Sequence, residues 1–354
     1  MTGRKGKAFA HEDTFIQKIW RQMLCPYMAI TIFLFLAACT APGPTASPSA
    51  TPDLQATIDA ALAGTQAAEA NLQATVDAAI AATAQAAVTP TGADLSEQSE
   101  EATVDEIETT VDSCASNTAA ASTASEATSD DALTAEEADQ IYTYYQLAYA
   151  DLEEAYALLS GYYAFYGELA QESLDLLHDL EEDLDDLNAA LGELNTAILI
   201  IQTQLIAGAT PSAGDIARLE TAADSANTAA DNARTMAGTW ATAHEIEIAE
   251  RAAEVNYTIA EAIPANRVDT ITSVYTFLDD LKAALLDRVI SADELALLLV
   301  DRANALAGID AHGGATLQKA VDPLNQITVM IATGNFPAAR AAIPDFEAIL
   351  PDRP

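Results

Sequence analysis

The fold is decided by residues 177–205, LHDLEEDLDDLNAALGELNTAILIIQTQL. Leucine or isoleucine recurs in this stretch at alternating steps of three and four residues, and most positions between them are acidic or small. Such spacing places one apolar stripe along one face of an α-helix, as in helices that pack lengthwise on a partner. The stretch therefore predicts a coiled-coil helix.

The same register extends upstream to a helix start signal. Thr134 and Glu137 form the S/T-x-x-E pattern of a capping box. The seam from there to Leu177 holds one polar residue, Ser173, and consists of Tyr142, Tyr145, Tyr149, Leu152, Tyr156, Leu159, Tyr163, Tyr166, Ala170 and Ser173. An unbroken helix over the 64 residues from 142 to 205 would be roughly 95 Å long at ~1.5 Å per residue.

A turn near 207–212 is predicted to fold a second helix back on the first. Gly208 and Pro211 end one helix, and Ser212 caps the next. The second helix carries a seam made mostly of alanine, whose small side chains complement the leucines. Residues 134–263 are thus predicted to form an antiparallel coiled-coil hairpin.

The second seam slips in register at His244, level in the hairpin with Ala170 and Ser173. A slip of this kind locally unwinds a supercoil. Two interpretations stay open: a built-in bend or small polar pocket at this height, or coincidence.

Residues 264–354 are predicted to form a small bundle of four or five shorter helices. Ser291 and Glu294 repeat the capping-box pattern. The segment GNFPAARAAI (334–343) is similar to the turn between paired helices of tetratricopeptide-like repeats. No run alternates as a strand would, so the whole chain is predicted to be all-α.

An apolar run of signal-peptide length, MAITIFLFLAA at 28–38, follows a basic N-terminal region. Its end, Leu36-Ala37-Ala38-Cys39, resembles the lipobox of bacterial lipoproteins. The resemblance covers residues 1–39 alone and implies that the signal peptide (1–38) is cleaved after Ala38 and that Cys39 carries lipid. An uncleaved membrane anchor is the alternative, and either one places the body outside the cytoplasmic membrane. The body resembles no family beyond generic coiled-coil and helical-bundle proteins.

A low-complexity stalk is predicted after Cys39. Residues 39–53 are a Pro/Ser/Thr-rich spacer, and 54–89 hold two 18-residue helical repeats with one narrow apolar stripe. That stripe either supports a homo-oligomer, packs elsewhere on the chain or stays partly helical. Residues 90–133 are predicted to be an acidic disordered linker, with a short helix at 103–111 as an option. Cys114 in this linker is either a free thiol or the site of an interchain disulfide.

The formal charge of the chain is −39. Residues 1–38 contain five basic and two acidic residues, so their removal leaves 10 bases against 52 acids, a charge of −42. Such a field repels nucleic acids and anionic lipid headgroups, and it favours cations and a cationic or envelope protein as partner.

No catalytic constellation is recognisable, and we expect no enzyme. The acidic run 181–186 lacks the glycine turn of an EF-hand, so no specific metal site is expected, although Ca²⁺ or Mg²⁺ could bind diffusely. Packed or surface positions are expected for His178, His244 and His312. The tyrosines are expected in the core rather than on a ligand platform, with hydroxyls that need partners.

These features predict an extracytoplasmic, lipid-anchored structural or adhesive protein that projects a helical head from the membrane. The first alternative is a helical module that binds a ligand or cation. The second is an α-helical pore-forming protein, suggested by the apolar residues 197–201.

Overall fold

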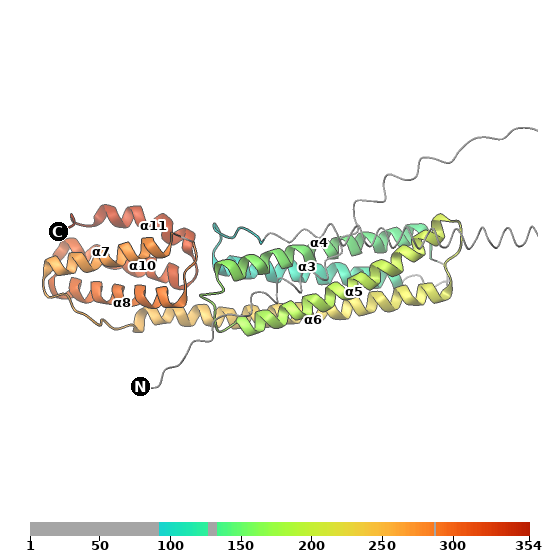
Figure 1. Ribbon diagram of the computed structural model, residues 1–354, viewed down its shortest axis with the longest axis horizontal. Coiled ribbons are helices and arrows are strands. Elements are labelled where there is room, and N and C mark those ends of the chain that lie inside the picture. Colours follow the sequence, from blue (N-terminus) through green and yellow to red (C-terminus); the bar gives the residue numbers. More distant parts are fainter. Residues whose placement is uncertain (1–91, 127–132, 287) are drawn as a thin grey trace, which may run out of the picture. The chain divides into compact units, whose positions relative to one another are not determined.

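The computed structural model describes residues 92–126, 133–286 and 288–354. It confirms the all-α prediction, since the described residues contain helices and no strand. Of the first four described helices, each of the first three packs against the next, and the first also packs against the fourth, which closes an antiparallel four-helix bundle (Figure 1). These helices are α3 (Glu100–Glu126), α4 (Ala135–Phe165), α5 (Leu174–Ile206) and α6 (Ala213–Tyr257).

The predicted turn at 207–212 is present between α5 and α6. Gly208 adopts a φ of 72°, and the Ser212 hydroxyl accepts a hydrogen bond from the Asp215 N–H. Leucines of α5 and alanines of α6 are fully buried where the two helices pack: Leu177, Leu180, Leu184, Leu187, Leu191 and Leu194 on α5, and Ala223, Ala226, Ala230 and Ala233 on α6. Each buried leucine contributes about 1.5–3 kcal/mol relative to an exposed one.

The first arm of the predicted hairpin is shorter than expected. The helix that begins at the Thr134 capping box ends at Phe165, and a turn over 166–173 reverses the chain into α5. Glu247 of α6 accepts hydrogen bonds from the backbone N–H groups of Glu172 and Ser173, which lie just before the first turn of α5. The prediction of one unbroken helix of about 95 Å was therefore wrong. Hydrophobic periodicity specifies which face of a segment is buried, but it does not show that the helix is continuous.

The prediction of a disordered acidic linker over 90–133 was also wrong for most of its length. Residues 100–126 form α3, which packs against both α4 and α6. Its buried face mixes Val104, Ile107 and Val111 with threonine, serine and alanine. The Thr118 hydroxyl bonds the Cys114 carbonyl at 2.8 Å, so a hydroxylated face can be buried without loss of hydrogen bonds.

The C-terminal segment forms the predicted set of shorter helices. The Ser291–Glu294 capping box opens α8, as predicted. Arg302 of this helix donates to the Val255 carbonyl of α6, and the Phe336 ring lies tilted against the Tyr166 ring, with their centroids 5.6 Å apart. The helices are α7 (Arg267–Ala284), α8 (Ala292–Gly308), a π-helical turn (Ile309–Gly313), α9 (Gly314–Gln318), α10 (Val321–Ala332) and α11 (Phe336–Ile349).

Most seam tyrosines lie in the core, as predicted, and two of them show the hydroxyl partners that burial requires. The Tyr156 hydroxyl donates to Asp185 at 2.8 Å, and the Tyr166 hydroxyl donates to the Gln98 carbonyl at 2.8 Å. Tyr162 is fully buried, whereas Tyr163, which the seam predicted, is only half-buried. The buried face therefore passes through Tyr162 in place of Tyr163 and returns to the predicted register at Tyr166.

Candidate functional site

Six polar side chains meet inside the bundle at the end where α4 turns into α5. We call them the buried polar cluster. Three of them, His244, Glu247 and Arg251, lie on one face of α6 because they are spaced three and four residues apart. All are at most 8% exposed, and they are Glu100 of α3, Tyr162 of α4, Ser173 before α5, and His244, Glu247 and Arg251 of α6.

Glu100 lies at the centre of the cluster. Its Oε1 accepts a hydrogen bond from the Tyr162 hydroxyl at 3.2 Å and lies 3.2 Å from His244 Nε2. Its Oε2 lies 2.5 Å from Arg251 Nη2. The Glu100 backbone N–H donates to the Gly334 carbonyl at 3.2 Å, so the same residue also connects α3 to the turn between α10 and α11.

Glu247 closes the turn between α4 and α5. Its two oxygens accept the N–H groups of Glu172 and Ser173 at 3.2 and 3.1 Å. Burial alone would raise the pKa of Glu247, but hydrogen bonds from His244, Ser173 and the Glu172 N–H, together with Arg251, lower it to about 2. The carboxylate is therefore charged at neutral pH.

His244 joins the two carboxylates. Its Nδ1 lies 3.2 Å from Ser173 Oγ, and its ring stacks 5.8 Å from Trp240. Burial lowers the pKa of His244, yet its contacts with Glu100 and Glu247 outweigh this effect and raise it overall. With His244 protonated, two cations balance two carboxylates, which is the condition under which buried charges are tolerated.

Ser173, His244 and Glu100 are ordered like a nucleophile, base and carboxylate. The Ser173 side chain is 2% exposed, however, and Glu100 is not exposed at all. A substrate could reach the hydroxyl only if the bundle opened. The arrangement therefore fits a structural network that joins α3, α4, α5 and α6, and the absence of enzyme activity stays a prediction.

Cys114 does not lie in a linker. Its thiol is fully buried between α3 and α4 and donates to the Ala148 carbonyl at 3.1 Å. Burial raises the pKa of Cys114 to about 12. The alternative prediction of an interchain disulfide at Cys114 is therefore wrong for the folded bundle, because a sulfur inside the bundle cannot reach a second chain.

The acidic run 181–186 lies on α5. Within the described part of the chain, no three potential ligands are close enough to hold a metal ion. Asp183 has a raised pKa, caused first by partial burial and then by Asp186, Asp179 and Glu182. This crowding of negative charge is the kind that diffuse cation binding would relieve, which remains a prediction.

Several predicted features lie outside the described residues: Ala38, Cys39, the spacer 39–53 and the repeats 54–89. Of the histidines, His178 and His312 are exposed and His244 is packed, as expected. Sequence reasoning placed an irregularity at Ser173 and His244 but missed Glu100, Tyr162, Glu247 and Arg251. The spacing of His244, Glu247 and Arg251 on one helical face was the available signal.

Comparisons of this chain with protein-family models, with curated proteins and with solved structures find no match. Its function therefore has to be inferred from its own residues.

The raised pKa of His244 predicts a stability that depends on pH. Protonated His244 stabilises the fold fully below its unfolded pKa of 6.5, and this contribution is lost as pH rises through the higher folded value. We expect the urea midpoint to fall as pH rises above 6.5, and to fall less in His244→Gln. Asp301, whose pKa is raised to about 6 by burial and Asp280, affects both proteins equally. Parallel profiles would show that His244 does not titrate in this range.

Proposed function

We propose that this chain is a non-enzymatic, lipid-anchored protein on the outer side of the cytoplasmic membrane, where its helical body serves as a structural or adhesive scaffold. The observation that carries the proposal is the apolar run that ends in Leu36-Ala37-Ala38-Cys39. The closed bundle supports it, because the side chains that could take part in catalysis, those of the buried polar cluster, are buried against each other and away from solvent.

The strongly negative charge of the proposed scaffold favours a positively charged partner. The chain without residues 1–38 would carry −42, and the acidic residues of α5 and α6 lie mostly on their exposed faces. We propose that the partner is a cationic or envelope protein, because the field of the scaffold attracts positive surfaces and repels nucleic acids. Self-association through residues 54–89 belongs to the same proposal.

The pore-forming alternative has one supporting observation. By length and composition, α5 is the described helix that could cross a membrane, a test that the core helix of a soluble protein also passes. Insertion would require Leu184, Leu187 and Leu191 to leave the core that they fill. The scaffold proposal requires no such rearrangement, so we prefer it.

Lipidation at Cys39 can be tested by metabolic labelling of the full chain with an alkyne fatty acid in a bacterial host. We expect label on the wild-type protein and on Cys25→Ser, because Cys25 precedes the cleavage site. Cys39→Ser should lose the label and accumulate as a precursor that is longer by residues 1–38. Label retained in Cys39→Ser would refute the anchor, and digestion of intact spheroplasts by added protease tests the side of the membrane.

A further inference from the structure

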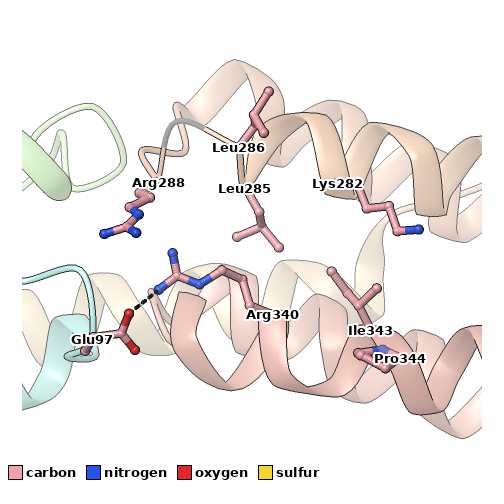
Figure 2. Close-up of a pocket in the computed structure, with 8 residues that line it drawn as sticks. All are labelled: Glu97, Lys282, Leu285, Leu286, Arg288, Arg340, Ile343 and Pro344. Carbon is pink, nitrogen blue, oxygen red and sulfur yellow. Dashed lines mark ion pairs between the residues drawn. The ribbon is translucent and has the colours of Figure 1, made fainter.

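A pocket of about 370 Å³ lies between the C-terminal part of α7, the segment that follows it, and α11. Three basic side chains line it: Lys282 and Arg288 on one side and Arg340 of α11 on the other (Figure 2). The two guanidinium groups lie at the same end of the pocket in this view. The volume is within the range of small-molecule sites, about 300–1,000 Å³.

Three basic residues in one pocket are unusual for this chain. Beyond residue 38 the sequence has 10 basic residues against 52 acidic ones, and three of the ten line this pocket. Others are occupied inside the fold, such as Arg251 in the buried polar cluster and Arg302 on the Val255 carbonyl. The pocket therefore gathers an unusually large share of the basic residues of a strongly negative protein.

Two of the three cations are held in place by neighbours. Arg340 donates to the Ser96 carbonyl and lies 3.8 Å from Glu97 Oε1, a long ion pair with an 81% exposed side chain. Lys282 pairs with Glu347. Each of these two cations therefore already faces a carboxylate of the chain, which leaves Arg288 as the cation for a ligand and suits a monoanion better than a dianion.

Arg288 is the free member of the set. Among the described residues, its guanidinium makes no hydrogen bond or ion pair. Its charge acts on Asp94, whose lowered pKa is due first to hydrogen bonds with Ser96 and last to Arg288. Arg288 also adopts a φ of 69°, a left-handed conformation that few non-glycine residues take. Such strain concentrates at ligand-binding positions.

Apart from Glu97, the rest of the lining is apolar. Leu285 and Ile343 line the pocket, and the neighbouring Leu286 is 84% exposed. A large apolar side chain that stays in solvent beside a guanidinium suits a ligand with both an anionic and an apolar part. Guanidinium groups bind carboxylates through paired hydrogen bonds.

We infer that this pocket binds a monoanionic carboxylate attached to an aliphatic group, with Arg288 and Arg340 on the carboxylate and Leu285, Leu286 and Ile343 on the aliphatic part. A short fatty acid and the C-terminus of a peptide that ends in leucine share this chemistry. The site is independent of lipidation at Cys39, so either proposal can fail without the other.

The test is calorimetric titration of the full chain in nanodiscs of zwitterionic lipid, with empty nanodiscs as blank. Hexanoate and the peptide acetyl-Ala-Ala-Leu represent the two sources, and hexanol, acetate and the amidated peptide are their matched controls. We expect at least one of the two carboxylates to bind with one-to-one stoichiometry and about tenfold more tightly than its controls, since a charge-assisted contact contributes about that factor. The source that binds identifies the ligand class.

Variants of Arg288 separate binding from folding. Arg288→Gln should weaken binding about tenfold. Arg288→Gly should weaken it equally while keeping or raising stability, because glycine tolerates the positive φ. Arg218→Gln removes an exposed charge elsewhere and should leave affinity unchanged. The inference is overturned if neither carboxylate exceeds its controls, or if Arg218→Gln weakens binding as much as Arg288→Gln.

Discussion

Replacement of Arg251 by methionine is expected to lower the free energy of unfolding by about 3–5 kcal/mol. Methionine keeps much of the side-chain volume but leaves Glu100 and Glu247 buried without the cation that lies between them. The original contact is itself incomplete, because Arg251 Nε and Nη1 are buried without hydrogen bonds. The large loss therefore comes from two buried carboxylates left with His244 as their one remaining cation in the cluster, and urea unfolding of the full chain measures it.

The matched control is Arg234→Met on the same helix. Arg234 pairs with Asp112 at 2.7 Å, but its side chain is 37% exposed, so we expect a loss of about 1 kcal/mol or less. Addition of Glu100→Gln to Arg251→Met should recover part of the loss, because one unpaired charge is removed. Equal losses for Arg251→Met and Arg234→Met would show that burial does not decide the energy of the cluster.

Gly334→Ala is expected to destabilise the protein by about 2–4 kcal/mol. Gly334 has a φ of 63°, which costs a residue with a Cβ about 1–2 kcal/mol. An added Cβ would also lie 2.4 Å from the Glu100 Cβ and 2.3 Å from its Oε2. Because α3 would have to shift, the hydrogen bond from the Glu100 N–H to the Gly334 carbonyl should weaken as well.

Two other glycines separate the two costs in this prediction, that of the positive φ and that of the steric contact with Glu100. Gly208→Ala keeps the cost of a positive φ, here 72°, in open space, so a loss of about 1–2 kcal/mol is expected. Gly192→Ala, inside α5 and also in open space, should stabilise the protein by about 0.5–1 kcal/mol. If Gly334→Ala cost no more than Gly208→Ala, the close approach of α3 to this turn would be disproved.

The sequence predicted the position of the buried polar cluster but only part of its membership. The weak point of the first seam at Ser173 and the register slip at His244 predicted an irregularity at one height, and the structure places their side chains 3.2 Å apart. Glu100 could not be assigned to it, because it lies 144 residues before His244 in a segment that resembled a linker. Local pattern shows which positions break a seam but not which distant residue fills the gap.

The helices differ in how clearly the sequence predicts them. Leucines at regular spacing make α5 evident, and Gly208 with Ser212 marks its hairpin with α6. The buried face of α3 contains three aliphatic residues, Val104, Ile107 and Val111, and otherwise mostly threonine, serine, alanine and Cys114, so its hydropathy contrasts little with that of the exposed side. Its order comes from packing on α4 and α6, which supply the burial that its own composition lacks.

Sequence by itself determined the all-helical class, the buried faces of α5 and α6, their connecting turn and the helix starts at Thr134 and Ser291. These depend on spacing and capping within a few residues. Only the tertiary structure decided that the chain reverses at 166–173, that α3 completes the bundle and that Glu100 meets Arg251. Those outcomes depend on the pairing of distant charges and small surfaces, whose energy appears only when both partners are desolvated together.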